Sequence, residues 1–312
     1  MKKQKLLHIG KVMMMAALAP VLLAGCDSRY LILNPQGPVA QKEYNLIIFS
    51  IVLCAIVVIP VLGLLVYIVF RYRDKPENKA PYAPEWDDSK TLEIVWWGIP
   101  IVIIGILGFF TAKTTYNLVE PPKKDIEPLT IEVTSLDWKW LFQYPDQNIA
   151  TVNYVEIPED VPVQFVLTSD APMNSFWVPE LGGQLYSMPG MAMGLWLQAD
   201  HSGEFFGSGA NFTGDGFAHM TFKVTSKPQS EFDQWVKQVK QTAPALTKAD
   251  YDKLAEQGLS KEKSYSAIPE GLFKEIVDKN GGQYYKQHHH MNSEDIAEMR
   301  MNVGHQAHEH HE

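Results

Sequence analysis

The chain has 312 residues, of which 46% are apolar and 20% are charged, and its formal net charge at pH 7 is −9. The length allows one sizeable domain in addition to membrane segments, and the acidic balance argues against nucleic acid as a partner. Cysteine occurs only as Cys26 and Cys54, both near the N-terminus, so we expect neither a disulfide nor a cysteine-based metal site in the water-soluble part of the chain.

The first 25 residues have the features of a secretory signal peptide. Lysines form a basic start, and residues 12–22 are apolar but too few to span a bilayer. They lead into the sequence LAGC at 23–26, which resembles a bacterial lipobox, where the signal is cleaved before a cysteine that then carries lipid. A small-residue cleavage site with a chance cysteine is the alternative. We expect residues 1–25 to be a lipoprotein signal, Cys26 to be lipidated and residues 26–45 to form a lipidated outer segment.

Two longer apolar segments follow. Residues 46–70 carry no charge and are long enough to cross ~30 Å of hydrocarbon, and residues 93–112 are just long enough. The loop between them, residues 71–92, is rich in Lys and Arg, which favours the cytoplasmic side. A lipidated Cys26 must lie outside, which gives the same orientation. We therefore predict a transmembrane helix hairpin, with everything after residue 112 on the outer side.

The next part of the chain is rich in β-strand patterns. After a proline-containing linker at 113–127, short segments alternate between apolar and polar residues and are separated by turn residues. Many short strands with regular turns are typical of a sandwich or a barrel. We predict such a domain in residues 128–227, with strands at 129–134, 151–157, 161–168, 193–199 and 220–224.

Helical spacing returns in an extension at 228–280. The apolar residues of 230–242 fall on one helix face, with Ser230 as the expected N-cap. A second short helix is expected to start at Thr247, and a third helix could cover 272–277. We therefore predict that the β-rich domain is followed by a short, mainly helical unit.

One segment of the β-rich domain carries a specific resemblance. Residues 205–220 (FFGSGANFTGDGFAHM) resemble the copper-binding loop of subunit II in haem-copper oxidases, C-x-E-x-C-G-x-x-H-x-x-M, in which two thiolates join two copper ions. Gly214 and Met220 match that pattern. The other ligand positions, including a histidine upstream of the loop, hold residues of other types: Asn174, Gly209, Asn211, Thr213 and Phe217. A kept scaffold without its copper ligands is similar to subunit II of the quinol oxidases.

Further motifs support the same resemblance. They are LDWKWLFQYP at 136–145, MNSFWVP at 173–179 and TLE at 91–93, and they occur in family order. The resemblance implies a membrane-anchored α+β fold, in which an N-terminal two-helix transmembrane hairpin is followed by a cupredoxin-like β-sandwich and a short helical C-terminal extension. We interpret the aromatic run at 136–145 as a strand with cross-strand packing.

Glu93 is the residue with a possible role in proton transfer. By the orientation above it lies at the cytoplasmic edge of the second span, where a carboxylate is costly unless it meets water, a partner or a proton path. In the family, the matching glutamate stands at the mouth of a proton-uptake channel of the catalytic subunit. The alternative is an interfacial charge that only marks the helix end. We interpret Glu93 as a proton-entry residue and expect no catalytic residue in this chain.

The resemblance also implies a complex and a location. The complex would be a bo-type ubiquinol oxidase or a related aa-type menaquinol oxidase that oxidises quinol, reduces O₂ to water and pumps protons. Its haems and one copper are expected in catalytic subunit I, and no cofactor is expected on this chain. Partners would be subunit I, other small membrane subunits and the lipid bilayer, but not cytochrome c. The location would be the bacterial cytoplasmic (inner) membrane, with the C-terminal domain on the periplasmic side.

Two alternatives use copper. A cytochrome c oxidase subunit II would need two thiolates that the outer domain lacks. A membrane-tethered copper-handling lipoprotein could use the thioethers of Met188, Met191 and Met193 and the histidine-rich tail at 281–312, which has a composition typical of disordered sequence. We interpret these methionines as packing residues and the tail as without a physiological metal role.

Overall fold

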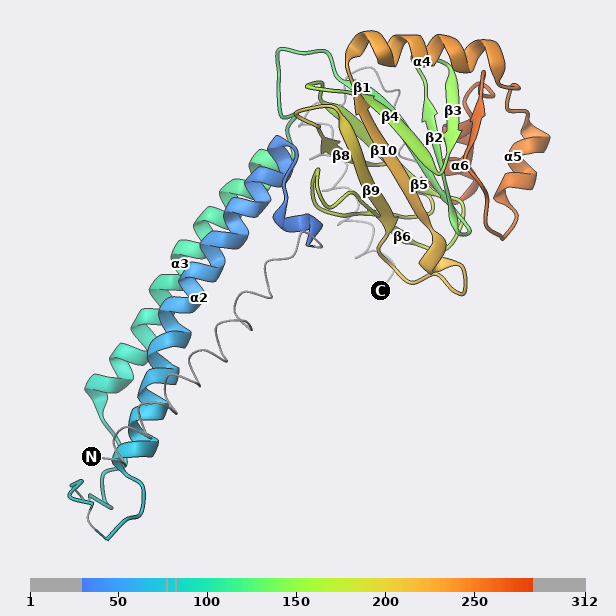
Figure 1. Cartoon of the computed structure of the whole chain (residues 1–312). Helices are drawn as coiled ribbons and strands as arrows, with labels where there is room; N and C mark the ends of the chain where they lie inside the picture. The colour runs from blue at the N-terminus through green and yellow to red at the C-terminus, as the bar shows by residue number, and fades with distance from the viewer. Residues whose placement is uncertain (1–29, 77, 82, 283–312) are drawn as a thin grey trace, which may run out of the picture.

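The computed structural model describes residues 30–76, 78–81 and 83–282. Two long helices, α2 (Pro38–Arg71) and α3 (Lys90–Leu118), lie side by side as a rod, and a β-sandwich sits at one end of it (Figure 1). Both helices are long and apolar enough to cross a membrane, and almost none of either apolar window is buried inside the protein. The predicted pair of membrane-spanning segments is confirmed at this level.

Both helices extend beyond the predicted spans. Helix α2 starts at Pro38, whose ring suits the first turn of a helix. Helix α3 has Ser89 as its N-cap, with the side chain accepting a hydrogen bond from the backbone N–H of Leu92. The predicted linker at 113–127 is helical as far as Leu118, because no proline or glycine interrupts the sequence before Pro121.

In the described part of the chain, the β-strands form a two-sheet sandwich. One sheet has six strands in the order β11-β3-β2-β1-β5-β8 and the other has five in the order β4-β10-β9-β6-β7. The strands are β1 (Leu129–Leu136), β2 (Lys139–Tyr144), β3 (Ile149–Val152), β4 (Tyr154–Pro158), β5 (Val163–Ser169), β6 (Asn174–Trp177), β7 (Leu185–Ser187), β8 (Met193–Leu197), β9 (Gly203–Gly209), β10 (Thr221–Lys227) and β11 (Lys263–Tyr265).

An aromatic core fills the space between the sheets. Trp140 and Phe142 of β2 are fully buried and pack edge-on or tilted against Phe176 and Phe222 of the opposite sheet. The rings of Phe176 and Phe222 stack with centroids 4.9 Å apart. The interpretation of residues 136–145 as a strand is confirmed for 139–144, but Leu136 ends β1, residues 137 and 138 form a turn, and the rings pack on the opposite sheet rather than on neighbouring strands. Strands β6, β7, β9 and β11 were not predicted.

The prediction of one strand over 151–157 is wrong. The chain breaks at Asn153, which has a φ of 58°, and crosses from β3 in one sheet to β4 in the other. Asparagine tolerates this left-handed conformation better than most residues. Its side chain fixes the break, because Oδ1 accepts from the backbone N–H of Trp140 at 2.9 Å and Nδ2 donates to the carbonyl of Ser260 at 2.8 Å.

The C-terminal extension packs on the sandwich through three helices, α4 (Gln229–Thr242), α5 (Lys248–Ala255) and α6 (Leu272–Lys279). The second helix begins where it was expected, with Thr247 as the N-cap of α5 and its hydroxyl accepting from the backbone N–H of Asp250 at 3.1 Å. Ser230 is not the N-cap of α4. The helix starts at Gln229 and Pro228 takes the cap position, because its ring fixes a φ of −53° and its carbonyl accepts from Glu231 and Phe232.

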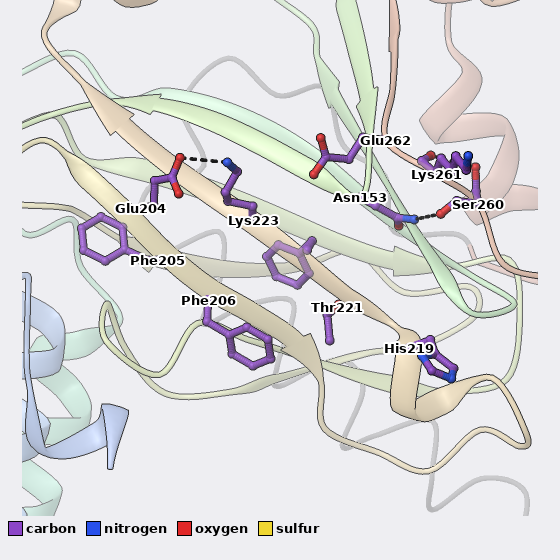
Figure 2. Close-up of a pocket in the computed structure, with 11 residues that line it drawn as sticks. Asn153, Glu204, Phe205, Phe206, His219, Thr221, Lys223, Ser260, Lys261 and Glu262 are labelled. Atoms are coloured by element: carbon purple, nitrogen blue, oxygen red, sulfur yellow. Dashed lines mark hydrogen bonds and ion pairs between the residues drawn. The ribbon is translucent and has the colours of Figure 1, made fainter. Parts of the chain in front are cut away.

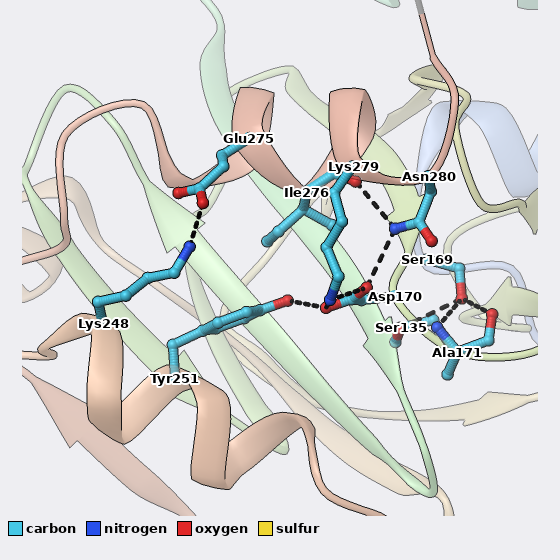
Figure 3. Close-up of polar contacts among 10 residues, drawn as sticks. All are labelled: Ser135, Ser169, Asp170, Ala171, Lys248, Tyr251, Glu275, Ile276, Lys279 and Asn280. Carbon is cyan, nitrogen blue, oxygen red and sulfur yellow. Dashed lines mark hydrogen bonds and ion pairs between the residues drawn. The ribbon is translucent and has the colours of Figure 1, made fainter.

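Asp170, directly after β5, holds this extension in place (Figure 3). Its carboxylate accepts from the Tyr251 hydroxyl at 2.7 Å and from Lys279 and Asn280 at 3.0 Å each. Burial alone would raise the pKa of Asp170, but hydrogen bonds from Asn280, Tyr251 and Lys279 outweigh it and hold the pKa below its usual value. One buried carboxylate thus joins α5 and α6 to the sandwich.

The start of α2 is clamped to the sandwich. The backbone N–H of Gln36 donates to the carbonyl of Glu180 at 2.8 Å, and the carbonyl of Gln36 accepts from Asp200 at 3.0 Å. At Gly37, an added Cβ would lie 1.9 Å from the carbonyl oxygen of Gln198, so this close approach needs glycine. Val39 is also buried, with 4% of its surface exposed. The rod and the sandwich therefore meet at a packed joint.

Candidate functional site

The residues that resemble a copper loop gather at one end of the five-stranded sheet. Strand β9 ends at Gly209, next to β6, and the chain then loops through the short helix η2 (Phe217–His219) into β10. Asn174 opens β6 and lies beside Gly209, while Met220 directly precedes β10. The structure thus brings together positions that are separated by up to 46 residues in the sequence.

Asn174 forms the centre of this site and is fully buried. Its Nδ2 donates to the sulfur of Met220 at 2.9 Å, and its Oδ1 accepts from the backbone N–H of Ser175 at 2.7 Å and of Asn211 at 3.3 Å. An added Cβ at Gly209 would lie 2.9 Å from the Asn174 amide. The amide therefore fills the space that a larger side chain at Gly209 would need.

Trp138 covers the other half of the loop. Its indole N–H donates to the carbonyl of Thr213 at 3.1 Å. Added Cβ atoms at Gly214 and Gly216 would lie 3.3 and 2.1 Å from the ring, so the indole lies flat against a glycine backbone. Trp138 has a φ of 66°, a conformation that bulky residues rarely adopt. The sequence identified this tryptophan only as part of an aromatic run, although the glycines at 214 and 216 are consistent with a ring packed over them.

Phe217 occupies the remaining ligand position and packs against another aromatic residue. Its ring lies edge-on to that of Phe212, with centroids 5.8 Å apart. Phe212 is 79% exposed at the tip of the loop. The loop thus presents an aromatic pair, one member of which stands at a position that the sequence resemblance aligns with a copper ligand.

These donors do not fit a dinuclear copper centre. Copper in such a centre needs bridging thiolates and imidazoles, and the site instead offers an amide and one thioether. The hydroxyls of Ser175 and Thr213 are buried and lack hydrogen-bond partners among the described residues, but hydroxyl oxygens suit harder cations. In the part of the chain that the structure describes, no three His, Cys, Asp or Glu side chains form a group that could hold a metal ion.

A shallow groove of about 800 Å³ lies beside the loop, between strands β9 and β10 and the segment 260–262 (Figure 2). Its clearest polar contact is the ion pair of Glu204 and Lys223, with Oε1 and Nζ 2.8 Å apart. Since these two charges pair with each other, they are not poised for acid–base chemistry. His219 and Phe206 line the same groove.

The methionine loop is part of the packing of the sandwich. Met193 lies in β8 and packs against the main core. Gly190, with a φ of 74°, lies so close to the end of the extension that an added Cβ would be 2.5 Å from the carbonyl oxygen of Asn280. This arrangement supports the interpretation of the loop as a packing element.

Glu93 lies in the first turn of α3, at the end of the rod that is distant from the sandwich (Figure 1). The side chain is exposed, and its backbone N–H donates to the carbonyl of Ser89 at 2.9 Å. A carboxylate in the first turn also interacts favourably with the helix dipole. Cys26 and the histidine-rich tail at 283–312 lie outside the described residues.

Two family models match different parts of this chain. Residues 34–113 match the family described as cytochrome C oxidase subunit II, transmembrane domain, and residues 147–227 match its periplasmic domain. Among solved structures, the periplasmic domain of subunit II of cytochrome oxidase from Bradyrhizobium japonicum is 24% identical, with a TM-score of 0.35, and covers 36% of this chain and 94% of that one.

Full-length relatives are closer in sequence. Quinol oxidase subunit 2 of Bacillus cereus is 47% identical over 259 residues, which cover 81% of this chain and 89% of the relative. Cytochrome bo(3) ubiquinol oxidase subunit 2 of Pseudomonas putida is 43% identical over 286 residues, which cover 90% of each chain. Since these identities extend over the hairpin and the sandwich alike, the chain belongs to the quinol oxidase subunit 2 family, within the cytochrome oxidase subunit II proteins.

Proposed function

We propose that this chain is subunit 2 of a haem-copper quinol oxidase, a complex that oxidises quinol, reduces O₂ to water and pumps protons. The observation that carries the proposal is the hydrogen bond from Asn174 to the Met220 sulfur, in the place where the related copper proteins bind metal. The sandwich is kept while its metal donors are replaced. Electrons then bypass this chain, and cytochrome c has no entry point on it.

The role of the chain would be structural. The exposed apolar surfaces of α2 and α3 suit contact with lipid and with the membrane helices of catalytic subunit I. The clamp at Gln36 and Gly37 would hold the sandwich as a cap over the outer face of that subunit. Haems, one copper and the quinol site would belong to the partner subunits.

Two residues carry finer proposals. Glu93 would deliver protons at the cytoplasmic face, since it is exposed at the inner end of the rod. Cys26 would carry the lipid anchor, which the mass of the mature chain would reveal. In this arrangement the sandwich lies on the periplasmic side of the bacterial inner membrane.

Metal analysis of the purified complex tests the proposal. The complex would be isolated in mild detergent through a tag on this chain, and its haem and copper would be quantified per chain. We expect haem together with a single copper per complex. Copper bound to this chain without any haem-bearing partner would instead identify a copper-handling lipoprotein and overturn the proposal.

A further inference from the structure

A short turn before the first long helix exposes apolar side chains. The turn η1 (Leu31–Leu33) has no buried residue. The exposed fractions are 57% for Tyr30, 40% for Ile32 and 47% for Leu33. Three neighbouring large apolar residues in contact with water are unfavourable, and such patches mark surfaces that are covered in the working protein.

The turn lies beside α2 rather than beyond its end (Figure 1). From η1 the chain rises to the helix start at Pro38, and α2 then runs back past the turn and contacts it. The first turns of α2 carry polar side chains up to Asn45, and strongly exposed apolar residues begin at Ile48. The turn is therefore close to the level at which the surface of α2 changes from polar to apolar, which marks the edge of the hydrocarbon region.

We infer that Tyr30, Ile32 and Leu33 are inserted into the outer leaflet of the bilayer, at the boundary between headgroups and acyl chains. The patch lies beside α2, whose exposed apolar residues need a nonpolar environment. Tyrosine is favoured at this boundary, where its ring is buried and its hydroxyl stays hydrated. The sequence places Cys26 only four residues before Tyr30, a reach of at most about 14 Å, so a lipid on this cysteine would hold the turn at the same surface.

The insertion would set the height of the outer domain. Between η1 and α2, the segment around Gln36 and Gly37 is clamped to the sandwich by backbone hydrogen bonds to Glu180 and from Asp200. The turn therefore cannot change its depth independently of the sandwich. It would act as a third contact with the membrane, beside the two helices, and limit the tilt of the domain over its partner subunit.

Site-directed spin labelling of the whole complex in liposomes tests this inference. Cys54 is replaced by serine, and nitroxide labels are attached at Ile32→Cys or Leu33→Cys. Glu231→Cys, on the exposed face of α4, provides a matched water-exposed reference. Collision with O₂, which concentrates in lipid, and with a polar nickel complex, which does not, gives the depth of each label. The haem spectrum of each variant confirms assembly.

We expect the labels at 32 and 33 to collide with O₂ at least about threefold more often, relative to the nickel complex, than the label at 231. Labels that meet the nickel complex as readily as the reference would place the turn in water and overturn the inference. Immobilised labels shielded from both reagents would show that a protein subunit covers the patch, which would also overturn it. A polar maleimide gives an independent measurement, because it should modify a cysteine introduced at position 32 or 33 more slowly than one introduced at position 231.

Discussion

At the scale of single residues, Asn174 organises the loop that follows β9 through its buried amide. One buried amide satisfies two backbone donors and contacts the sulfur of Met220. A buried polar group without partners is costly, so this network stabilises the loop around Asn174. At a position that the sequence resemblance aligns with a copper ligand, Asn174 thus has a structural role.

Truncating Asn174 should destabilise the outer domain. Asn174→Ala leaves the N–H groups of Ser175 and Asn211 without their acceptor, and we expect a loss of about 1–3 kcal/mol in the free energy of unfolding. The measurement is chemical denaturation of the full chain in detergent. Asn211→Ala is the matched control, because it keeps the backbone N–H that donates to Oδ1 of Asn174. It should lower the free energy of unfolding by less than about 0.5 kcal/mol. Equal effects of the two changes would contradict this role.

Substitution of Glu93 tests its proposed role in proton entry. We expect Glu93→Ala to slow O₂ reduction by the complex several-fold. Removal of a positioned proton-transfer group slows a reaction roughly 10²-fold or more, and the effect here should be smaller because water reaches this exposed position. Haem content should stay unchanged, and Glu93→Asp should retain most of the activity. Normal turnover and normal proton pumping by the alanine variant would show that the carboxylate only marks a helix end.

At the scale of elements, the joint between α2 and the sandwich depends on one glycine. Gly37→Ala would place a Cβ 1.9 Å from the carbonyl oxygen of Gln198, so the backbone must shift. We expect a loss of about 1–3 kcal/mol, seen as a lower midpoint of denaturation. Gly63→Ala in the middle of α2 is the control, since no atom lies within 4 Å of its added Cβ. A tolerated change at Gly37 would mean that the clamp is not rigid.

The C-terminal extension should detach from the sandwich at low pH. The pKa of Asp170 is held below its unfolded value, which is about 3.9. Its contribution to stability is therefore complete above that value and is lost as the pH falls through the lower folded pKa. We expect the change in stability between pH 5 and pH 2.5 to be smaller in Asp170→Asn than in the unchanged chain. Proteolysis of α5 and α6 across this range measures it, and identical pH profiles would contradict the assignment.

The elements also show what the sequence could predict. Long apolar runs and regular alternation identified both spans and most long strands, because hydrophobic periodicity reports burial directly. The break at Asn153 could not be predicted from the sequence, because a residue in the left-handed conformation between two strands leaves the alternation of apolar and polar residues intact. Strands β6 and β7 are too short to show a period. In the site, the resemblance to the subunit II family drew attention to Asn174 and Met220, but it gave no sign of the packing of Trp138 on Gly216, which depends on tertiary contacts.

At the scale of the whole molecule, the fold joins three parts through specific polar contacts. The rod carries apolar surface on nearly all sides, the clamp at Gln36 fixes the sandwich to the rod, and Asp170 fixes the extension to the sandwich. Such a unit is suited to position and cover a partner rather than to perform chemistry itself. The role that we propose for the chain, as a brace and cap within an oxidase, rests on these contacts and on the amide and thioether at the loop around Asn174.

The most direct test of this account is the electron donor that the purified complex accepts. O₂ uptake would be measured with a quinol and, separately, with reduced cytochrome c, in the same preparation isolated through this chain. The account predicts rapid uptake with quinol and none above background with cytochrome c, because no copper centre in the sandwich receives electrons. Rapid uptake with cytochrome c would mean that the loop around Asn174 still carries an electron-entry site, and the central claim would be wrong.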